Sequence, residues 1–253
     1  MLRDDLGEPY RGSPTRVVSL VPSLTEAVAV SAPPGLLVGA TDWCTHPEGM
    51  EVCRVGGTKY PDLAKVRDCR PDLVLANAEE NRREDVQALR EAGIPVWVTY
   101  PRDLETAFDS LSRLFRALGV DRPQWLHEAE SVWSSPTPDT RRRAVVPVWR
   151  RPWVVLGGRT FAGDLLRRLG VDNVFSDSPE RYPRPNLEYV LSRRPDLVVL
   201  PDEPYRFTAD DGPEAFPGVP YALLSGRHLT WYGPSLAAAR SLLERQLANT
   251  ATG

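Results

Sequence analysis

Aromatic side chains lie next to charged ones in the segments that follow the expected strands of this 253-residue chain. Aromatic rings stack on flat or bulky groups, and guanidinium groups pair with carboxylates or phosphates. The pattern therefore indicates a bulky ligand with anionic edges. By contrast, Trp97, Trp125 and Trp133 are expected in the core or on helix faces. The candidate ligand-binding residues are Trp43, Lys59, Tyr60, Asn81, Tyr100, Trp149, Arg150, Trp153, Arg159, Tyr182, Arg184, Glu203, Tyr205 and Trp231.

Direct metal binding and nucleophilic catalysis have little support in the sequence. The chain has 3 histidines, and no HxxxH or CxxC spacing joins them or the cysteines into a ligand set. There is no GxSxG motif, and Cys44 beside His46 is interpreted as a coincidence within a loop. We therefore expect a protein that binds without catalysing and that has no metal site and no intrinsic cofactor.

One glycine pair stands where a strand is expected to lead into a helix. Gly157-Gly158-Arg159-Thr160 is similar to a phosphate-binding turn, and the helix that it opens would attract an anion. It lacks the lysine of a Walker loop and the glycine spacing of a dinucleotide fold. It is thus only a weak indication of a nucleotide ligand.

Composition excludes several classes of protein. The formal net charge is -3 and the basic residues form no stripe, so a nucleic-acid partner is not expected. No run approaches the roughly 18 apolar residues that a membrane span needs. The N-terminus is polar, and the 3 cysteines are odd in number, so we expect reduced thiols in a cytoplasmic protein. The expected location is periplasmic or extracellular if an export signal was removed.

The elements that must position these residues include a duplicated stretch. Arg-Pro-Asp-Leu-Val occurs at 70–74 and again at 194–198, and the same offset sets Leu63 against Leu187 and Val66 against Val190. Each copy predicts a short helix, a Pro-Asp turn and a buried strand. A second correspondence, at a larger offset, sets Val17-Val18 with Ser23 against Val154-Val155 with Thr160. These two correspondences predict two similar α/β lobes with a ligand between them.

The order of expected elements gives an α/β fold with parallel sheets, because strands alternate with helices. The expected domains are an N-terminal lobe at 1–120, a linking helix and linker at 121–141, and a C-terminal lobe at 142–253. Ser23 and Glu26 have the spacing of a capping box for the first helix. The predicted strands include 16–21, 36–40, 94–100, 143–149, 153–156 and 173–175, and the predicted helices include 24–30, 103–118, 123–133 and 161–169.

Several of these motifs resemble one family. The segment 16–26, both Arg-Pro-Asp-Leu-Val strands, segment 170–175, and Tyr182-Pro183 followed by Glu188 are similar to the class III, helical-backbone substrate-binding proteins. These are the cobalamin, haem and iron-siderophore receptors of ABC importers, and the likeness is closest to the vitamin B12-binding type. The resemblance implies two Rossmann-like lobes joined by one helix, with aromatic side chains lining a cleft that holds a corrinoid, haem or ferric siderophore.

The resemblance also implies a permease as partner. Exported members dock through one surface glutamate in each lobe; Glu188 matches the second, whereas Ala64 occupies the first position. This difference favours a cytoplasmic binding protein that no longer serves a transporter. Two alternatives stay open: an importer subunit whose export signal is absent, and a biosynthetic enzyme that holds its substrate with Arg150 or Arg159.

Overall fold

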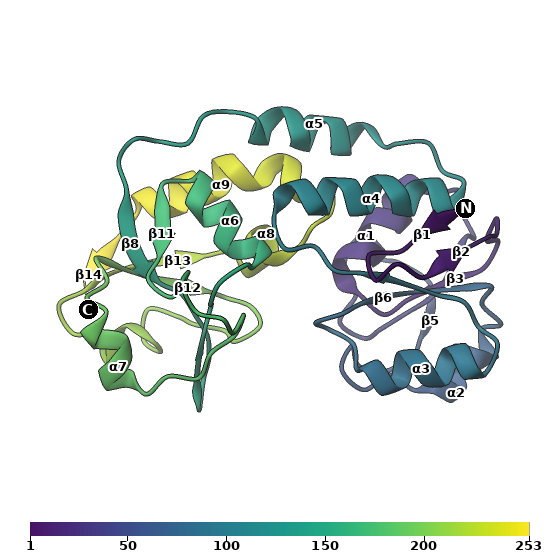
Figure 1. The fold of residues 1–253 in the computed structure, drawn as a ribbon, viewed down its shortest axis with the longest axis horizontal. Helices are drawn as coiled ribbons and strands as arrows, with labels where there is room; N and C mark the ends of the chain where they lie inside the picture. Colours follow the sequence, from purple (N-terminus) through teal and green to yellow (C-terminus); the bar gives the residue numbers. More distant parts are fainter. Residues whose placement is uncertain (253) are drawn as a thin grey trace. The chain divides into compact units, whose positions relative to one another are not determined.

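The computed structural model describes residues 1–252, which divide into two compact units (Figure 1). Unit 1 contains Met1–Pro101, Glu105–His127 and Tyr232–Pro234. Unit 2 contains Arg102–Leu104, Glu128–Trp231 and the chain from Ser235 onward. Among the described residues, no helix has both the length and the apolar character that a membrane span requires.

Unit 1 is built on a sheet of five parallel strands in the order β5-β4-β3-β6-β7. Strands β3 and β6 are buried along their whole length, because helices cover both faces of the sheet. Figure 1 shows α1 and α4 on one face and α2 and α3 on the other. The strands are β3 (Val17–Ser19), β4 (Leu37–Ala40), β5 (Cys53–Arg54), β6 (Leu73–Asn77) and β7 (Val96–Thr99), and the helices are α1 (Pro22–Ser31), α2 (Leu63–Asp68), α3 (Arg83–Glu91) and α4 (Leu104–Leu118).

An antiparallel hairpin that was not predicted precedes this sheet. Strands β1 (Leu2–Arg3) and β2 (Pro9–Tyr10) pair with each other. Asp4 and Asp5 then accept hydrogen bonds from the backbone N–H groups of Val98 (3.0 Å) and Tyr100 (2.6 Å). The two carboxylates thereby satisfy one backbone N–H group in edge strand β7 and one just beyond its end.

Unit 2 has a five-stranded sheet in the order β11-β8-β12-β13-β14, in which only β14 is antiparallel. Figure 1 shows α6, α8 and α9 on one face and α7 on the other. A separate hairpin, β9–β10, is antiparallel. The elements are β8 (Arg142–Val145), β9 (Pro147–Arg150), β10 (Trp153–Val155), α6 (Phe161–Arg168), β11 (Val171–Asn173), α7 (Leu187–Ser192), β12 (Leu197–Pro201), η1 (Pro213–Ala215), β13 (Pro220–Leu224), α8 (Gly226–Thr230), α9 (Leu236–Ala248) and β14 (Ala251–Thr252).

The division between the units falls inside α5 (Gln124–Trp133), between His127 and Glu128. In unit 1, Trp125 meets Phe115 edge to face at 6.0 Å. In unit 2, buried Trp133 donates its indole N–H to the carbonyl of Leu236 at 3.0 Å. A helix is therefore present where one was predicted at 123–133, while its linking role and the predicted domain bounds stay predictions. Trp97 and Trp133 lie in the core as expected.

The duplicated stretch folds in the same way in both units. Each copy ends its helix with an arginine in the left-handed region, Arg70 at φ 48° and Arg194 at φ 49°. The aspartate of each copy then accepts the N–H of an arginine that opens the neighbouring strand: Asp72 from Arg16, and Asp196 from Arg143. The guanidinium of the same arginine donates hydrogen bonds to backbone carbonyls at the turn. The predicted α/β fold with two similar, mainly parallel sheets is confirmed.

The second correspondence was wrong. Strand β10, which contains Val154 and Val155, lies in the antiparallel hairpin, and β8 occupies the place that β3 has in unit 1. The register shows the true equivalence, since Val17 pairs with Leu73 as Ala144 pairs with Leu197. An apolar run alone does not distinguish a central parallel strand from a hairpin strand.

Two local predictions also fail. The strand expected at 143–149 is divided at Val146 into β8 and β9. Helix α1 has no capping box, because it begins at Pro22 and its N-cap, Val21, has no side chain that accepts a hydrogen bond. In unit 2, Thr160 does cap α6, where it accepts the N–H of Gly163.

Candidate functional site

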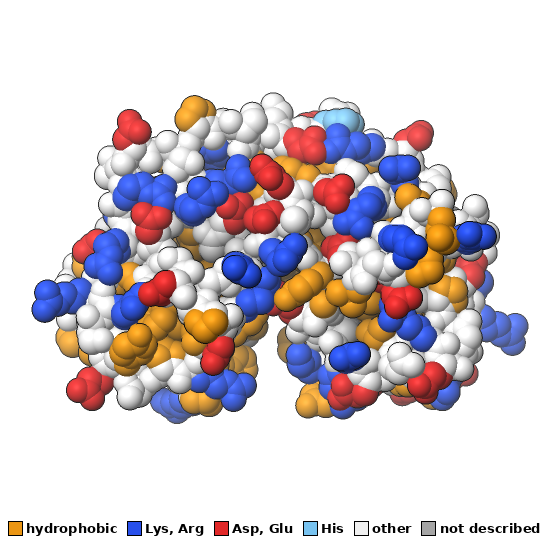
Figure 2. Space-filling view, viewed as in Figure 1, with side chains coloured by type: hydrophobic (Ala, Val, Ile, Leu, Met, Phe, Trp, Pro, Cys, Tyr) orange, Lys and Arg blue, Asp and Glu red, His pale blue; other side chains and the backbone are white. Residues whose placement is uncertain are grey.

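The candidate residues all lie in segments that follow the carboxyl ends of strands, where parallel α/β sheets place their ligands. In unit 1 they follow β4, β5, β6 and β7. In unit 2 they lie in the hairpin after β8, at the start of α6, and in the segments after β11, β12 and β13. Figure 2 shows that apolar side chains reach the surface between charged ones on both units.

Two aromatic rings of unit 1 are strongly exposed. Trp43 is 68% exposed and Tyr60 is 70% exposed, so neither ring contributes much to the core. The guanidinium of Arg82 lies over the Tyr60 ring at 4.6 Å. The Lys59 ammonium is already engaged within the protein, because it donates a hydrogen bond to the carbonyl of Glu79 at 3.2 Å. Trp43 and Tyr60 are thus available to a ligand as stacking surfaces.

Asn81 has a structural position instead. Its side chain is buried, and its oxygen accepts the N–H of Asn77 at 2.8 Å. Its nitrogen donates to the carbonyls of Leu20 (3.3 Å) and Thr58 (2.9 Å). The amide therefore connects the segments after β3, β5 and β6 and positions the exposed residues beside it.

A buried polar group near these segments was not among the candidates. The Tyr232 hydroxyl accepts a hydrogen bond from Asn77 Nδ2 at 2.7 Å and pairs with Thr99 Oγ1 at 3.0 Å.

Glu80 was not a candidate either. Burial raises the pKa of Glu80 to about 7, as does the charge of Glu79, whereas Lys59 opposes the shift. The sequence signal for Glu80 was the pair of adjacent acids directly after a buried strand.

Unit 2 gathers its rings into what we call the hairpin aromatic cluster: Trp149, Trp153, Tyr205, Phe207 and Phe216. Trp153 stacks on Phe207 with an interplanar angle of 2° and meets Phe216 edge-on at 5.6 Å. Trp149 meets Tyr205 at 5.5 Å and is still 44% exposed. Phe207 and Phe216 were not candidates, because a phenylalanine in an irregular segment carries no charge pattern that would mark it.

Arg150 holds this cluster together. Its guanidinium forms ion pairs with Asp211 and Glu214 and lies 5.6 Å from the centre of the Trp153 ring. The Tyr205 hydroxyl donates to the same Asp211 at 2.6 Å. Since both acids already neutralise it, Arg150 has little charge left for an anionic ligand.

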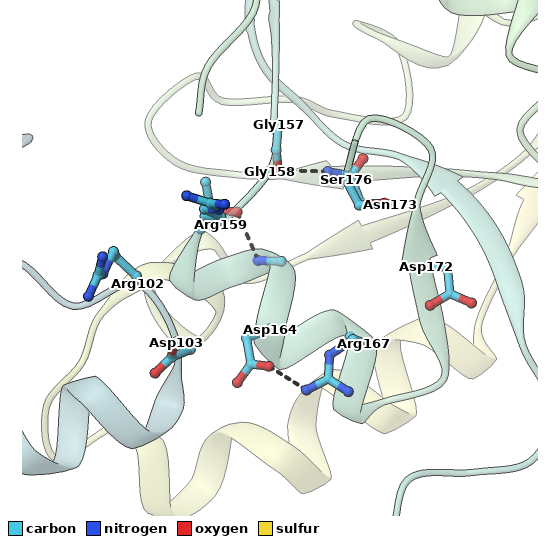
Figure 3. A pocket seen from close by; sticks show the side chains of 12 residues that line it. Arg102, Asp103, Gly157, Gly158, Arg159, Asp164, Arg167, Asp172, Asn173 and Ser176 are labelled. Atoms are coloured by element: carbon cyan, nitrogen blue, oxygen red, sulfur yellow. Dashed lines mark hydrogen bonds and ion pairs between the residues drawn. The ribbon is translucent and has the colours of Figure 1, made fainter. Parts of the chain in front are cut away.

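A polar pocket of about 460 Å³ lies within unit 2, at the start of α6 (Figure 3). Several of its charges are paired: Asp164 bonds to Arg167 and Arg168, and Asp172 to Arg141. Figure 3 shows Arg102, Asp103 and Arg159 well separated from Asp172 across the view. The candidate Arg159 therefore lines this pocket on a side of mixed charge.

Gly157 and Gly158 of this pocket allow another backbone segment to pack closely against them. A side chain at Gly158 would come within 2.6 Å of the Ser178 carbonyl and 2.8 Å of the Ser176 carbonyl. One at Gly157 would collide with the carbonyl of Glu180. Close packing of the 176–181 segment thus explains both glycines, and the suggested phosphate-binding turn finds no support.

The remaining candidates lie at the surface of unit 2. Tyr182 is 42% exposed, and Arg184 is also exposed. Partial desolvation of the Glu203 carboxyl and the charge of Asp202 raise the pKa of this exposed residue, whereas a hydrogen bond from Trp231 opposes the shift. The Trp231 ring lies 5.5 Å from the guanidinium of Arg227. Tyr182 thus adds an exposed ring after β11.

Each of the three histidines has a polar neighbour. Nδ1 of His46, His127 and His228 lies 2.8–3.1 Å from Thr45, Arg122 and Ser225, respectively. Over residues 1–252, no group of three or more His, Cys, Asp or Glu side chains is arranged to hold a metal ion.

Ala64 and Glu188 occupy equivalent places. Each is the second residue of a six-residue helix, α2 or α7, and each is exposed. The N-caps are equivalent too, since Asp62 and Asn186 both accept backbone N–H groups from the first turn. The docking role implied for Glu188 stays a prediction.

Comparison with known proteins agrees with this architecture. No protein-family profile matches the chain. It is 24% identical over 194 residues to a vitamin B12-binding protein of Yersinia pestis (strain Pestoides F). The matched region covers 73% of this chain and 69% of that protein. Similar solved structures include the periplasmic vitamin B12-binding protein BtuF of Vibrio cholerae (TM-score 0.71, 19% identity, 93% of this chain and 97% of that one).

A second solved structure is the periplasmic heme-binding protein RhuT of Roseiflexus sp. RS-1 (TM-score 0.76, 19% identity, 93% of this chain and 98% of that one). At these identities a structural likeness reports the fold, and the sequence motifs point in the same direction. The resemblance of this chain to the class III, helical-backbone superfamily of substrate-binding proteins is thereby confirmed, and the chain has the fold of that superfamily.

Proposed function

We propose that the protein binds a metal chelate of the corrinoid, haem or ferric-siderophore kind and does not transform it. The observation that carries this proposal is the set of exposed aromatic rings after strand ends in both units: Trp43 and Tyr60 in unit 1, and Trp149 and Tyr182 in unit 2. Exposed aromatic rings in the segments after strands offer flat apolar area on which a bulky ligand can stack. The vitamin B12-binding and heme-binding relatives support the class of ligand.

A fluorescence titration tests the proposal. The purified protein is titrated with cyanocobalamin, haem and ferric siderophores while tryptophan emission is followed. We expect saturable quenching by one of these classes and weaker binding by at least about fivefold in Trp43→Ala, because stacking on an aromatic ring contributes about 1–3 kcal/mol. If none of the three classes binds, the proposed function is wrong and only the fold stands.

A matched pair of tyrosines controls for general surface effects. Tyr182 and Tyr189 are 42% and 50% exposed, but Tyr189 lies on α7 rather than in a segment after a strand. Tyr182→Ala should weaken binding, whereas Tyr189→Ala should leave the dissociation constant unchanged. Equal effects of the two substitutions would contradict the placement of the ligand.

For the cellular role, we propose the importer alternative over the cytoplasmic carrier. The support is that the solved relatives are periplasmic binding proteins, which outweighs the expectation drawn from the N-terminal residues and Ala64. Cell fractionation of the native source should place the protein outside the cytoplasm. Glu188→Ala should lower ligand uptake without changing affinity, while Ala64→Glu should not lower it.

The enzyme alternative now depends on Arg159 alone. Arg150 is engaged in two ion pairs, so its substitution would disturb the hairpin and not report on a substrate. Turnover of a bound ligand that disappears in Arg159→Ala, with the fold intact, would favour an enzyme. The named relatives are binding proteins, which supports the proposal that this protein binds its ligand without transforming it.

A further inference from the structure

Cys53 and Cys69 of unit 1 both approach strand β4 at Gly39, a residue that has no side chain. Cys53 lies in edge strand β5, and Cys69 is the C-cap residue of α2. Between them runs β4, in which Gly39 is the register partner of Cys53. Both cysteines therefore approach Gly39, from the neighbouring strand and from the covering helix.

The geometry at Gly39 shows how closely they converge. A Cβ atom at this glycine would lie 3.2 Å from Cys69 Sγ and 3.5 Å from the carbonyl oxygen of Cys53. The Cys53 thiol is also near enough to contribute to the raised pKa of Cys69. A side chain at Gly39 would also come within 3.0 Å of Val18 Cγ2, so the Cys69 thiol and Val18 together take the space beside this glycine, next to the Cys53 backbone.

Their accessibilities differ in a way that suits thiol-disulfide exchange. Cys53 is exposed, whereas Cys69 is 6% exposed. The third cysteine, Cys44, is buried elsewhere, with its sulfur 3.1 Å from the hydroxyls of both Thr25 and Thr41. An oxidant in solution therefore reaches Cys53 first, and Cys69 is its available neighbour.

We propose that Cys53 and Cys69 form a thiol-disulfide site that low-molecular-weight disulfides, such as oxidised glutathione, oxidise to an intramolecular disulfide. The Cys53 thiolate attacks the glutathione disulfide, which gives a mixed disulfide and releases one glutathione thiolate. The Cys69 thiolate then attacks Cys53 Sγ and releases the second glutathione. Both cysteine protons end on the two released thiolates, so two protein thiols are oxidised and one glutathione disulfide is reduced.

The second step is expected to be the slow one. Burial and the neighbouring Cys53 raise the pKa of Cys69 to about 11, although the guanidinium of Arg16 opposes this. Because the thiolate is the nucleophile, little of Cys69 is reactive at neutral pH. Closure of the disulfide should therefore accelerate about tenfold per pH unit between pH 7 and 9. The resulting bond would tie edge strand β5 to the turn that begins the first duplicated strand.

Alkylation and mass spectrometry test the site on the full chain. The protein is treated with oxidised glutathione, denatured, and alkylated with iodoacetamide. Reduced protein should take one label on each of its 3 cysteines. Oxidised protein should take a label only on Cys44, and a peptide linking Cys53 to Cys69 should appear. Cys44→Ser should form the same linked peptide.

Single substitutions separate the two steps. Cys69→Ser should accumulate the mixed disulfide of Cys53 with glutathione, whereas Cys53→Ser should take up glutathione at least tenfold more slowly than Cys69→Ser. A stable mixed disulfide on wild-type Cys53, a link from Cys53 to Cys44, or a disulfide between two copies of the chain would each overturn the proposal. Since none of these readouts uses the bound ligand, the result does not depend on the proposed function.

Discussion

A single carboxylate fastens the duplicated turn to the neighbouring strand in each unit, and the two copies differ in strength. Asp72 accepts the N–H groups of Thr15 (2.8 Å) and Arg16 (3.0 Å) and the Thr15 hydroxyl (2.8 Å). Asp196 accepts one N–H, from Arg143 at 3.2 Å. Asp72→Ala should therefore lower the free energy of unfolding by about 1–3 kcal/mol, and Asp196→Ala by less, in urea denaturation. The reverse order would contradict this account.

The same aspartate gives a pH dependence. Burial alone would raise the pKa of Asp72, but the N–H groups of Thr15 and Arg16 outweigh it and hold the pKa below its ordinary value of 3.8. A lowered pKa in the folded state stabilises the protein above the unfolded-state pKa, and this contribution is lost as the pH falls through the folded-state pKa. The stability difference between wild type and Asp72→Asn should be constant from pH 7 to about 5 and shrink below about 4. A difference that grows on acidification would exclude this explanation.

Single residues also show what the sequence was able to predict. The rings of Trp43, Tyr60 and Tyr182, which the sequence places in segments after strands, are exposed, and their role in binding stays a prediction. The same pattern does not show which polar groups find partners. Asn81 and Arg150 are saturated by groups distant in sequence, and no local signal records such partners.

The β9–β10 hairpin is the element that the sequence described least well, and Arg150 is central to its stability. Its side chain is 14% exposed, and its guanidinium bridges the hairpin to Asp211 and Glu214. Arg150→Ala should lower the free energy of unfolding by about 1–2 kcal/mol, after allowance for the exposure of both acids. Arg151→Ala, at an exposed position in the same turn, is the control and should change it by less than about 0.5 kcal/mol. Similar losses in both variants would argue against the bridge.

Helices and parallel strands were predictable where the pattern is local. The short helix, the Pro-Asp turn and the buried strand recur because the duplicated residues fix a helix end, a turn and a partner strand within a few positions. Pairing partners were not predictable in this way. Val154-Val155 has the apolar character of β3, yet it pairs with β9, since strand pairing is decided by tertiary contacts.

The division of the whole molecule into two units does not follow the chain strictly. Tyr232–Pro234 belongs to unit 1, although the chain before and after it belongs to unit 2. Gly233 shows the fit, because a side chain there would lie 3.0 Å from the carbonyl of Ser23. A sequence repeat indicates that two units exist, but it cannot assign three residues near the C-terminus to the first of them.

Tyr232 therefore stabilises unit 1 from a distant part of the chain. Its buried hydroxyl pairs with Asn77 and Thr99 at the ends of β6 and β7. Tyr232→Phe keeps the ring but leaves these buried groups short of a partner, which should cost about 1–3 kcal/mol in the free energy of unfolding. Half-buried Tyr221 in β13 gives the control Tyr221→Phe, which should cost less. Hydrogen exchange should show faster exchange in β6 and β7 of Tyr232→Phe, and unchanged rates there would show that unit 1 does not depend on this residue.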